Sequence, residues 1–582
     1  MISTPLNINS LWSELIISEL IKLGIDYFCI CPGSRSTPLT VSVARNPKAK
    51  DIVCYDERGA AFHALGYARG CGKSAAVITT SGTAVANLFP AVIEASMDNI
   101  PMLLLTADRP PELQDTGANQ TIDQKEIFGK YVRKFANIPC PDENIPPENI
   151  LTLIDSCVYQ SKRNPPGPVH LNLQFREPLA PVGEDISDNY YNNTKMLIKQ
   201  KKPFTEYTKV TNVPGKRSIS DIANIINRSD QGIITAGRLK DSDEGKEILR
   251  LANKLKWPVF PDVLSGLRFE KGPPVINYFD LILLSDNFFG SALPDTVLHF
   301  GGQLTSKRFL QFIENNKINN HIVVKEHPYR HDPANSTTLR VESDISSFCK
   351  NLDKLIKIKR DNNSDLLLKK NSLVEKTISS YSRENTNLNE PVLSRVISQK
   401  IRKGTCLFIS SSLPIREMDM YSAASEKDVI TDSNRGVSGI DGTIASASGF
   451  AEGSGKNVTL ITGDLAFLHD INSLNMIKDI STSVTIIVIN NRGGGIFSFL
   501  PISEHTDVFE KYFGTPHSIS FKNAADMFGL EYHQPKNQKE FSTLYSSIQK
   551  TGKSAVIEVL TDRKENFDLQ QELQNKIRSV LI

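Results

Sequence analysis

Two short apolar segments in the last third of the chain constrain its fold most strongly, because polar side chains follow each of them at once. Residues 457–462 read Asn-Val-Thr-Leu-Ile-Thr, and residues 484–489 read Val-Thr-Ile-Ile-Val-Ile. Both are rich in β-branched residues, which is typical of strands buried on both faces of a parallel sheet. A Gly-Asp pair ending at Asp464 follows the first, and an Asn-Asn pair ending at Asn491 follows the second. The pattern predicts an open α/β sheet with both side chains at the carboxyl ends of strands, where such sheets bind ligands.

These polar pairs carry the donor atoms of a divalent-cation site. The Asp464 carboxylate, the Asn491 amide oxygen and the Gly493 backbone carbonyl are hard oxygen ligands. They suit Mg²⁺, which keeps its other positions for water and two phosphate oxygens. A Gly-Asp pair alone is common in turns, but its combination with an Asn-Asn pair one βαβ crossover downstream is much more specific. The combination resembles the diphosphate-anchoring motif of thiamine diphosphate enzymes.

This resemblance implies a second site near the amino terminus, where a carboxylate hydrogen-bonds the aminopyrimidine ring and activates the cofactor. Residues 51–56 are predicted to form a strand and its turn, Glu57 follows, and residues 58–66 form a helix rich in small residues. By itself, Glu57 would be a solvated acid stabilised by the helix dipole. Because Asp464 and Asn491 occur in the same chain, Glu57 is predicted to be the activating carboxylate.

Length, charge and cysteine usage indicate a large enzyme of the cytoplasm. A chain of 582 residues divides into about three or four domains that each bury a core. The net charge of +2 gives no reason to expect nucleic-acid binding, and no apolar run approaches the length of a membrane span. The amino terminus shows no signal-peptide pattern. The eight cysteines contain no CxxC pair, so we expect reduced thiols, no disulfide and no zinc.

Strand-like and helix-like segments alternate in three blocks, which predicts an α/β fold with three doubly wound parallel-sheet domains. The predicted domains are a pyrimidine-binding domain over 1–185, a middle domain over 203–360 and a diphosphate- and Mg²⁺-binding domain over 390–582. The polar segment 188–202 is predicted to be a linker. The charged segment 352–389 is predicted to form one or two solvated helices and a second linker.

Five strand-end loops present an arginine or lysine within a turn rich in Gly, Ser and Pro. The motifs are CPGSRSTP from Cys31, TADRP from Thr106, LTSKR from Leu304, SSSLPIRE from Ser410 and NRGVSGIDG from Asn434. A single arginine in such a turn is by default a surface side chain or part of a structural ion pair. Five together indicate substrates with several carboxylates, because arginine binds carboxylates in a bidentate manner.

With the motifs DERG from Asp56, GANQ from Gly117 and NNRGGGIF from Asn490, these segments resemble a narrower family. This family is 2-succinyl-5-enolpyruvyl-6-hydroxy-3-cyclohexene-1-carboxylate synthase, the MenD family of menaquinone and phylloquinone biosynthesis. The similarity extends over the whole chain and is densest in the first and third blocks. The family joins 2-oxoglutarate to isochorismate with loss of CO₂. The resemblance implies a transferase that uses thiamine diphosphate with Mg²⁺ or Mn²⁺ and forms a homodimer or a dimer of dimers.

The resemblance also implies a role for individual residues. Glu57 would activate the cofactor, and Asp464, Asn491 and the Gly493 carbonyl would hold the metal. Further cofactor contacts would come from Ser438, Ile440, Leu465, Ile496 and Phe497. Ser412, Arg416 and Arg435 would bind the part of the substrate derived from 2-oxoglutarate. The isochorismate side would comprise Ser34, Arg35, Arg109, Asn119, Gln120, Lys307 and Arg308. Leu465 stands where thiamine diphosphate enzymes usually have glycine.

Three alternatives remain at this point. The nearest is another thiamine diphosphate 2-oxo acid decarboxylase or an acetolactate synthase-like carboligase, although small mono-anionic substrates do not require so many strand-end cations. A catalytically silent binding protein is disfavoured by the presence of Glu57, Asp464 and Asn491. A nucleotide-binding protein is disfavoured because the sequence contains no G-x-x-x-x-G-K-[ST] motif.

Overall fold

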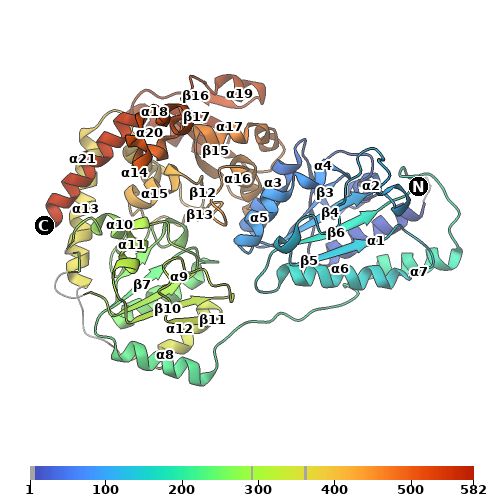
Figure 1. Ribbon diagram of the computed structural model, residues 1–582, viewed down its shortest axis with the longest axis horizontal. Coiled ribbons are helices and arrows are strands. Elements are labelled where there is room, and N and C mark those ends of the chain that lie inside the picture. The colour runs from blue at the N-terminus through green and yellow to red at the C-terminus, as the bar shows by residue number, and fades with distance from the viewer. Residues whose placement is uncertain (1–6, 287, 290–292, 359–363) are drawn as a thin grey trace. The chain divides into compact units, whose positions relative to one another are not determined.

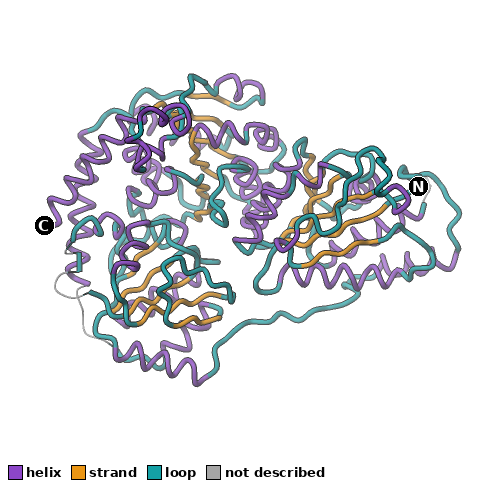
Figure 2. Tube along the Cα trace, viewed as in Figure 1, coloured by secondary structure: helices purple, strands orange, loops and turns teal. Residues whose placement is uncertain are grey.

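The computed structural model describes residues 7–286, 288–289, 293–358 and 364–582, and it contains three sheets flanked by helices (Figures 1 and 2). The chain forms two compact units. The first comprises Met1–Val210, Asn434–Val458 and Ala466–Val484, and the second comprises Thr211–Ser433, Thr459–Leu465 and Thr485–Ile582. The predicted α/β class with three parallel-type sheets is confirmed. The predicted domain boundaries stay a prediction.

The first sheet has six parallel strands in the order β2-β1-β3-β4-β6-β5. Its strands are β1 (Tyr27–Ile30), β2 (Lys50–Val53), β3 (Ala75–Thr79), β4 (Met102–Asp108), β5 (Lys134–Ile138) and β6 (Pro168–Gln174). Its helices are α1 (Ile8–Lys22), α2 (Thr37–Arg45), α3 (Glu57–Cys71), α4 (Thr83–Ala86), α5 (Phe89–Met97), α6 (Pro147–Lys162) and α7 (Asp188–Lys199). Strands β3, β4 and β6 are buried along their whole length, as expected where helices cover both faces of a sheet.

Helix α7 corrects the prediction that residues 188–202 form a linker. Tyr190, Thr194 and Leu197 of this helix are buried. Their spacing of four and three residues places them on one helical face. Trp12 of α1 donates a hydrogen bond from Nε1 to the Tyr190 hydroxyl at 2.8 Å. The segment is mostly polar, so its few apolar residues did not indicate a helix. Its packing against α1 shows that they form one buried face.

The middle sheet has five parallel strands in the order β11-β10-β9-β7-β8. Its strands are β7 (Gly232–Ala236), β8 (Val259–Pro261), β9 (Thr296–Phe300), β10 (Asn320–Lys325) and β11 (Leu339–Glu342). Its helices are α8 (Lys216–Arg228), α9 (Ser242–Leu255), α10 (Phe279–Ile282), α11 (Lys307–Asn315) and α12 (Ile345–Asp353). One face packs its alternate apolar residues against α8, α9 and α12.

The third sheet has six strands in the order β13-β12-β14-β15-β17-β16. Its strands are β12 (Cys406–Ile409), β13 (Ile430–Asp432), β14 (Val458–Gly463), β15 (Val484–Asn490), β16 (Glu531–His533) and β17 (Ala555–Leu560). Helices α14 (Glu390–Lys400), α15 (Leu413–Tyr421), α20 (Gln538–Thr551) and α21 (Arg563–Leu581) lie with it. One apolar core joins residues of this sheet to residues of the middle sheet.

Helix α13 (Ser364–Glu384) occupies most of the charged segment for which solvated helices were predicted. The helix itself is confirmed, but Leu367, Val374, Ile378 and Tyr381 are buried in the apolar core. The helix is therefore not simply solvated. Residues 359–363 of the same segment lie outside the described residues.

Helices α3 and α16 (Thr443–Ser454) pack with their backbones in contact within the first unit. A Cβ atom added to Gly66 would lie 2.0 Å from the Ser446 carbonyl oxygen, and one added to Gly449 would lie 1.9 Å from the His63 carbonyl oxygen. Only glycine permits this approach. The small residues that follow Glu57 are therefore explained by the partner helix.

Two further features of the chain are the state of its cysteines and the hydropathy of its helices. The eight cysteines are free thiols, and all of them except Cys71 are buried. Among the described residues, no helix is both long enough and apolar enough to cross a membrane.

Candidate active site

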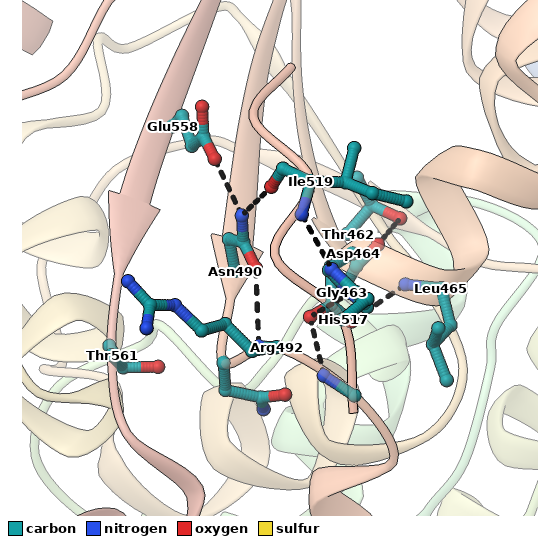
Figure 3. Close-up of polar contacts among 12 residues, drawn as sticks. Thr462, Gly463, Asp464, Leu465, Asn490, Arg492, His517, Ile519, Glu558 and Thr561 are labelled. Carbon is teal, nitrogen blue, oxygen red and sulfur yellow. Dashed lines mark hydrogen bonds and ion pairs between the residues drawn. The ribbon is translucent and has the colours of Figure 1, made fainter. Parts of the chain in front are cut away.

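Asp464 lies where the sequence pattern predicted it, at the carboxyl end of a strand. Strand β14 ends at Gly463, and Asp464 begins the short helix α17 (Asp464–His469). Its carboxylate is buried and fixed from three sides (Figure 3): Oδ1 accepts from the Leu465 N–H at 2.7 Å, Oδ2 accepts from the Gly493 N–H at 2.9 Å, and His517 Nε2 lies 3.2 Å from Oδ2. Burial raises the pKa of Asp464, and these hydrogen bonds act in the opposite direction. The result is a rigid, preoriented carboxylate.

Asn491 follows strand β15, the neighbour of β14 in the sheet. Its Nδ2 donates to Glu390 Oε1 at 3.1 Å. Its Oδ1 is buried and has no hydrogen-bond partner in the described structure. A buried amide oxygen without a partner is costly, so native proteins rarely retain one without a ligand. This oxygen therefore fits a cation ligand.

Gly493 completes the predicted metal set through its backbone. Its φ of +145° lies in a region that favours glycine, and an added Cβ would lie 2.0 Å from the Gly514 carbonyl oxygen. Its own carbonyl oxygen accepts from the Gly495 N–H at 3.0 Å, which leaves one lone pair free. A carboxylate, an orphaned amide oxygen and a backbone carbonyl on one sheet edge match the donor chemistry of Mg²⁺ or Mn²⁺.

Asn490, the first residue of the Asn-Asn pair, has a different role. Its Nδ2 donates to Glu558 Oε1 at 2.6 Å and to the Ile519 carbonyl oxygen at 3.0 Å, and its Oδ1 accepts from the Arg492 N–H at 3.1 Å (Figure 3). Every polar atom of this buried amide group therefore shapes the loop after β15. The two asparagines therefore differ in role: Asn490 stabilises the loop by hydrogen bonds, and Asn491 has an unpaired Oδ1 that fits a cation ligand.

A buried pair of carboxyl groups, which the sequence analysis did not identify, lies behind Asn491. Glu390 Oε1 also accepts from the Thr561 hydroxyl at 3.1 Å, and Glu417 Oε1 accepts from Gln570 Nε2 at 2.6 Å. The second oxygen of each group is buried and has no hydrogen-bond partner among the described residues. Burial raises the pKa of Glu390 and raises that of Glu417 well above its usual range, and the two groups interact with each other. The raised pKa values of both groups favour one proton held between them.

Glu57 lies in the first turn of α3, in the first unit. Asp56 caps this helix, accepting from the Arg58 N–H at 2.9 Å. Asn87 Nδ2 lies 3.4 Å from Glu57 Oε2, and the Glu57 side chain is half-buried. Arg58 donates from Nη2 to the His469 carbonyl oxygen at 2.8 Å. The carboxylate is therefore presented from a capped and anchored helix end.

The loop that precedes α16 carries Ser438 and Ile440, two of the residues predicted to contact the cofactor. Glu94 holds it by accepting from the backbone N–H groups of Gly436 and Val437 at 2.7 and 2.8 Å. Ser438 has a φ of +60° and is exposed, and Ile440 is half-buried. A pocket of about 360 Å³ adjoins this loop, and its lining includes Phe62, Phe89, Ile93, Val437, Gly439 and Asp441.

Ile496 and Phe497 follow the loop of Asn491 and Gly493 in the second unit. Both are half-buried within a short 3₁₀ segment, Gly495–Phe499. The Phe497 ring meets Phe513 edge-to-face at 5.6 Å between centroids. An added Cβ on Gly494 would lie 2.1 Å from the Phe513 carbonyl oxygen, so the glycines let this turn pack tightly. The turn offers apolar surface next to the loop that carries the predicted metal ligands Asn491 and Gly493.

Arg35 and Arg109 come together in the first unit. Arg35 is buried, donates from Nη1 to the Phe175 carbonyl oxygen at 2.9 Å and lies 3.3 Å from Glu177. Burial lowers the pKa of Arg35, and the charge of Arg109 lowers it further. The Nε atoms of both arginines are buried without a partner among the described residues. Two adjacent cations with unused donors fit an anionic ligand. The other three predicted residues of this side, Ser34, Asn119 and Gln120, are exposed.

The predicted cations of the second unit differ in their surroundings. Lys307 is exposed at the start of α11, whereas Arg308 forms an ion pair with Asp280 and donates to Gln574 Oε1 at 2.8 Å. Ser412 has a φ of +77° and accepts at its carbonyl oxygen from the Arg416 guanidinium, so the structure brings these two residues together. Arg435 lies in the first unit, half-buried in the loop before α16.

Comparison with known proteins gives consistent matches along the chain. Residues 12–127 match the thiamine pyrophosphate enzyme N-terminal TPP binding domain. Residues 188–409 match the middle domain of thiamine pyrophosphate enzymes, and residues 416–559 match the C-terminal TPP binding domain.

Relatives match over nearly the full length. The 2-succinyl-5-enolpyruvyl-6-hydroxy-3-cyclohexene-1-carboxylate synthase of Rubrobacter xylanophilus is 43% identical over 97% of this chain and 98% of its own. The proteins of the same name from Prosthecochloris aestuarii and Salinibacter ruber are each 40% identical, over 98% and 97% of this chain and 97% and 96% of their own.

Proposed function

Because the chain belongs to the 2-succinyl-5-enolpyruvyl-6-hydroxy-3-cyclohexene-1-carboxylate synthase family of thiamine diphosphate enzymes, we propose how its own residues carry out that reaction. The protein is a thiamine diphosphate-dependent transferase of menaquinone biosynthesis. Its substrates are 2-oxoglutarate and isochorismate. The observation that carries the assignment of the metal site is the buried, unpartnered Oδ1 of Asn491 beside the fixed carboxylate of Asp464.

The metal would be held by Asp464, Asn491 and the Gly493 carbonyl. Mg²⁺ or Mn²⁺ would keep its remaining positions for water and phosphate oxygens. The backbone N–H groups of Leu465 and Gly493 already fix the Asp464 carboxylate, so little reorganisation is required when the cation binds. Thiamine diphosphate, when bound, supplies the electron sink for decarboxylation.

Glu57 would hold a proton between its carboxylate and N1′ of the aminopyrimidine. Asn87 Nδ2 supplies a nearby donor to this carboxylate at the start of α3. Ser438 and Ile440 would contact the cofactor from the Glu94-anchored loop. Leu465, Ile496 and Phe497 would supply apolar contacts that exclude water from the reacting carboxylate.

The cations would orient the acids. Arg35 and Arg109 would use their unpartnered Nε donors for an isochorismate carboxylate, with Ser34, Asn119 and Gln120 at the exposed side. Ser412, Arg416 and Arg435 would bind the distal carboxylate derived from 2-oxoglutarate. Lys307 would extend an exposed charge toward isochorismate, and Asp280 and Gln574 would fix Arg308 beside it. Holding both acids in place lowers the entropic cost of bringing the two reacting groups together.

Incubation with thiamine diphosphate, Mg²⁺ and 2-oxoglutarate, with and without isochorismate, tests this function by mass spectrometry. The coupled product should appear only with isochorismate. Release of CO₂ and a simple aldehyde regardless of isochorismate would favour the decarboxylase alternative, which the relatives do not favour. We further propose that the protein works in the cytoplasm as a homodimer or a dimer of dimers. Glu57 of one subunit would then complete the cofactor site of the other.

A further inference from the structure

Lys325, at the end of β10, is a buried cation without a partner. Its side chain is 4% exposed, and its ammonium group makes no hydrogen bond or ion pair in the part of the chain that the structure describes. Burial, together with the charge of Arg340, lowers the pKa of Lys325 to about 8. A buried ammonium is normally paired or hydrogen-bonded, because the loss of its hydration is costly.

The strand pattern explains where this side chain points. Ile322 and Val324 of β10 lie in the apolar core with α8, α9 and α12, so Lys325 must point to the opposite face of the sheet. On the neighbouring strands Val341 and Leu298 belong to that same core. Arg340 of β11 and His299 of β9 therefore share the face of Lys325. That face is polar at this side of the sheet.

The segment between β10 and β11, residues 326–338, lies over this polar face. His321 Nδ1 is 2.9 Å from the Ser336 hydroxyl, and Asp332 accepts from the N–H groups of Ser336 and Thr337 at 3.2 and 3.0 Å. Arg340 donates to the carbonyl oxygens of Tyr329 and Arg330. The segment therefore covers the polar face on which Lys325 lies.

This polar face carries both cations and carboxylates. Burial lowers the pKa of His299 and His321, so both rings are neutral near pH 7. Lys325 and Arg340 are the cations on strands β10 and β11. The charge of Asp332 acts on both, and the charge of Glu342, the cross-strand neighbour of Lys325, acts on Arg340. Each terminal nitrogen of Arg340 gives one of its two N–H bonds to a carbonyl oxygen, while its Nε is buried without a partner among the described residues. The donors without a partner among the described residues are this Nε–H, one further N–H on each terminal nitrogen of Arg340, and the three N–H bonds of the Lys325 ammonium group.

We propose that Lys325 and Arg340 form a binding site for one small oxyanion, a phosphate or carboxylate group, on this face of the middle sheet. An oxyanion fits this face, because the buried Lys325 ammonium group and the buried Nε–H of Arg340 both lack an acceptor among the described residues. The site lies in the middle domain and does not depend on the assignments made for the cofactor and substrates.

Thermal unfolding of the full-length protein saturated with thiamine diphosphate and Mg²⁺ tests the site. Sodium phosphate is titrated at constant ionic strength, so that general screening does not contribute. The wild-type midpoint should rise in a saturable manner, by roughly 1–3 °C at a large excess of anion. Lys325→Met, which keeps the length of the side chain and removes its charge, should lose this rise. Its midpoint without phosphate should equal or exceed that of the wild type.

Lys317→Met is the matched control, because Lys317 is an exposed lysine of the same unit. It should keep the full phosphate response. A second titration with sodium acetate shows whether a carboxylate serves as well as a phosphate. An equal response in wild type and Lys325→Met, or no saturable response to either anion in the wild type, would overturn the proposal. If Lys325→Met does not fold, Lys325→Gln provides the same comparison.

Discussion

Replacing Glu390 by leucine should weaken divalent-cation binding without touching a metal ligand. Glu390 accepts the Asn491 Nδ2–H at 3.1 Å and so turns Oδ1 of the same amide toward the metal site. Leucine offers no acceptor, so the Asn491 amide loses the contact that orients it. Glu390→Gln is the matched variant: its Oε1 keeps both hydrogen bonds, from Asn491 and Thr561, and its Nε2 donates to Glu417 in place of the shared proton.

The magnitude follows from the contact that is lost. Leaving a buried donor unsatisfied costs about 1–3 kcal/mol, and a loss of this size in cation binding corresponds to roughly 5- to 150-fold in Kd. Substitutions of groups that orient metal ligands typically cost about 10- to 100-fold in metal affinity. We therefore expect Glu390→Leu to bind the cation about 10- to 100-fold more weakly, and Glu390→Gln to stay within about threefold of wild type, since it keeps the acceptor.

Manganese is the probe, because free Mn²⁺ is quantified directly by electron paramagnetic resonance in the presence of saturating thiamine diphosphate. Thermal unfolding of the cation-free proteins serves as the control for folding. Wild-type Mn²⁺ affinity in Glu390→Leu would refute the orienting role. Equal losses in the leucine and glutamine variants would also refute it, because a retained acceptor would then make no difference.

Four further outcomes are expected. Glu57→Gln should keep cofactor binding and lose about 10²- to 10⁴-fold in kcat, and turnover within about twofold of wild type would remove Glu57 from the proposed role. Asp464→Ala should abolish the Mg²⁺-dependent part of thiamine diphosphate affinity in a cofactor titration, and an unchanged titration would exclude it as a ligand. Arg416→Ala should raise KM mainly for 2-oxoglutarate and Arg35→Ala mainly for isochorismate, each by the equivalent of about 1.5–3 kcal/mol; equal effects on both substrates would contradict this division. Mixed dimers of Glu57→Gln and Asp464→Ala chains should regain activity because one of their two sites is intact, whereas proven heterodimers without activity would mean that both residues act within one chain.

Much of the local structure around the candidate site was predictable from the sequence. The runs before Asp464 and Asn491 are strands β14 and β15, and Glu57 begins α3 as predicted. These predictions succeeded because continuous β-branched runs and a capped helix start are local signals. The prediction of a linker after residue 187 was wrong. Helix α7 packs through a contact between Tyr190 and Trp12, two residues that are far apart in the sequence.

The residues that the sequence did not reveal are those whose role depends on burial by distant segments. Glu390 begins a helix, where an acid is ordinarily a solvated residue that favours the helix dipole. Its partner Asn491 is 101 residues away, and Glu417 lies on another helix, α15. Lys325 has the same character: at the end of a strand it would pass for a surface lysine, yet it is 4% exposed. In both cases the informative feature is that an ionisable group is buried. Only the tertiary structure shows that Glu390 orients Asn491 and that Lys325 lacks a partner among the described residues.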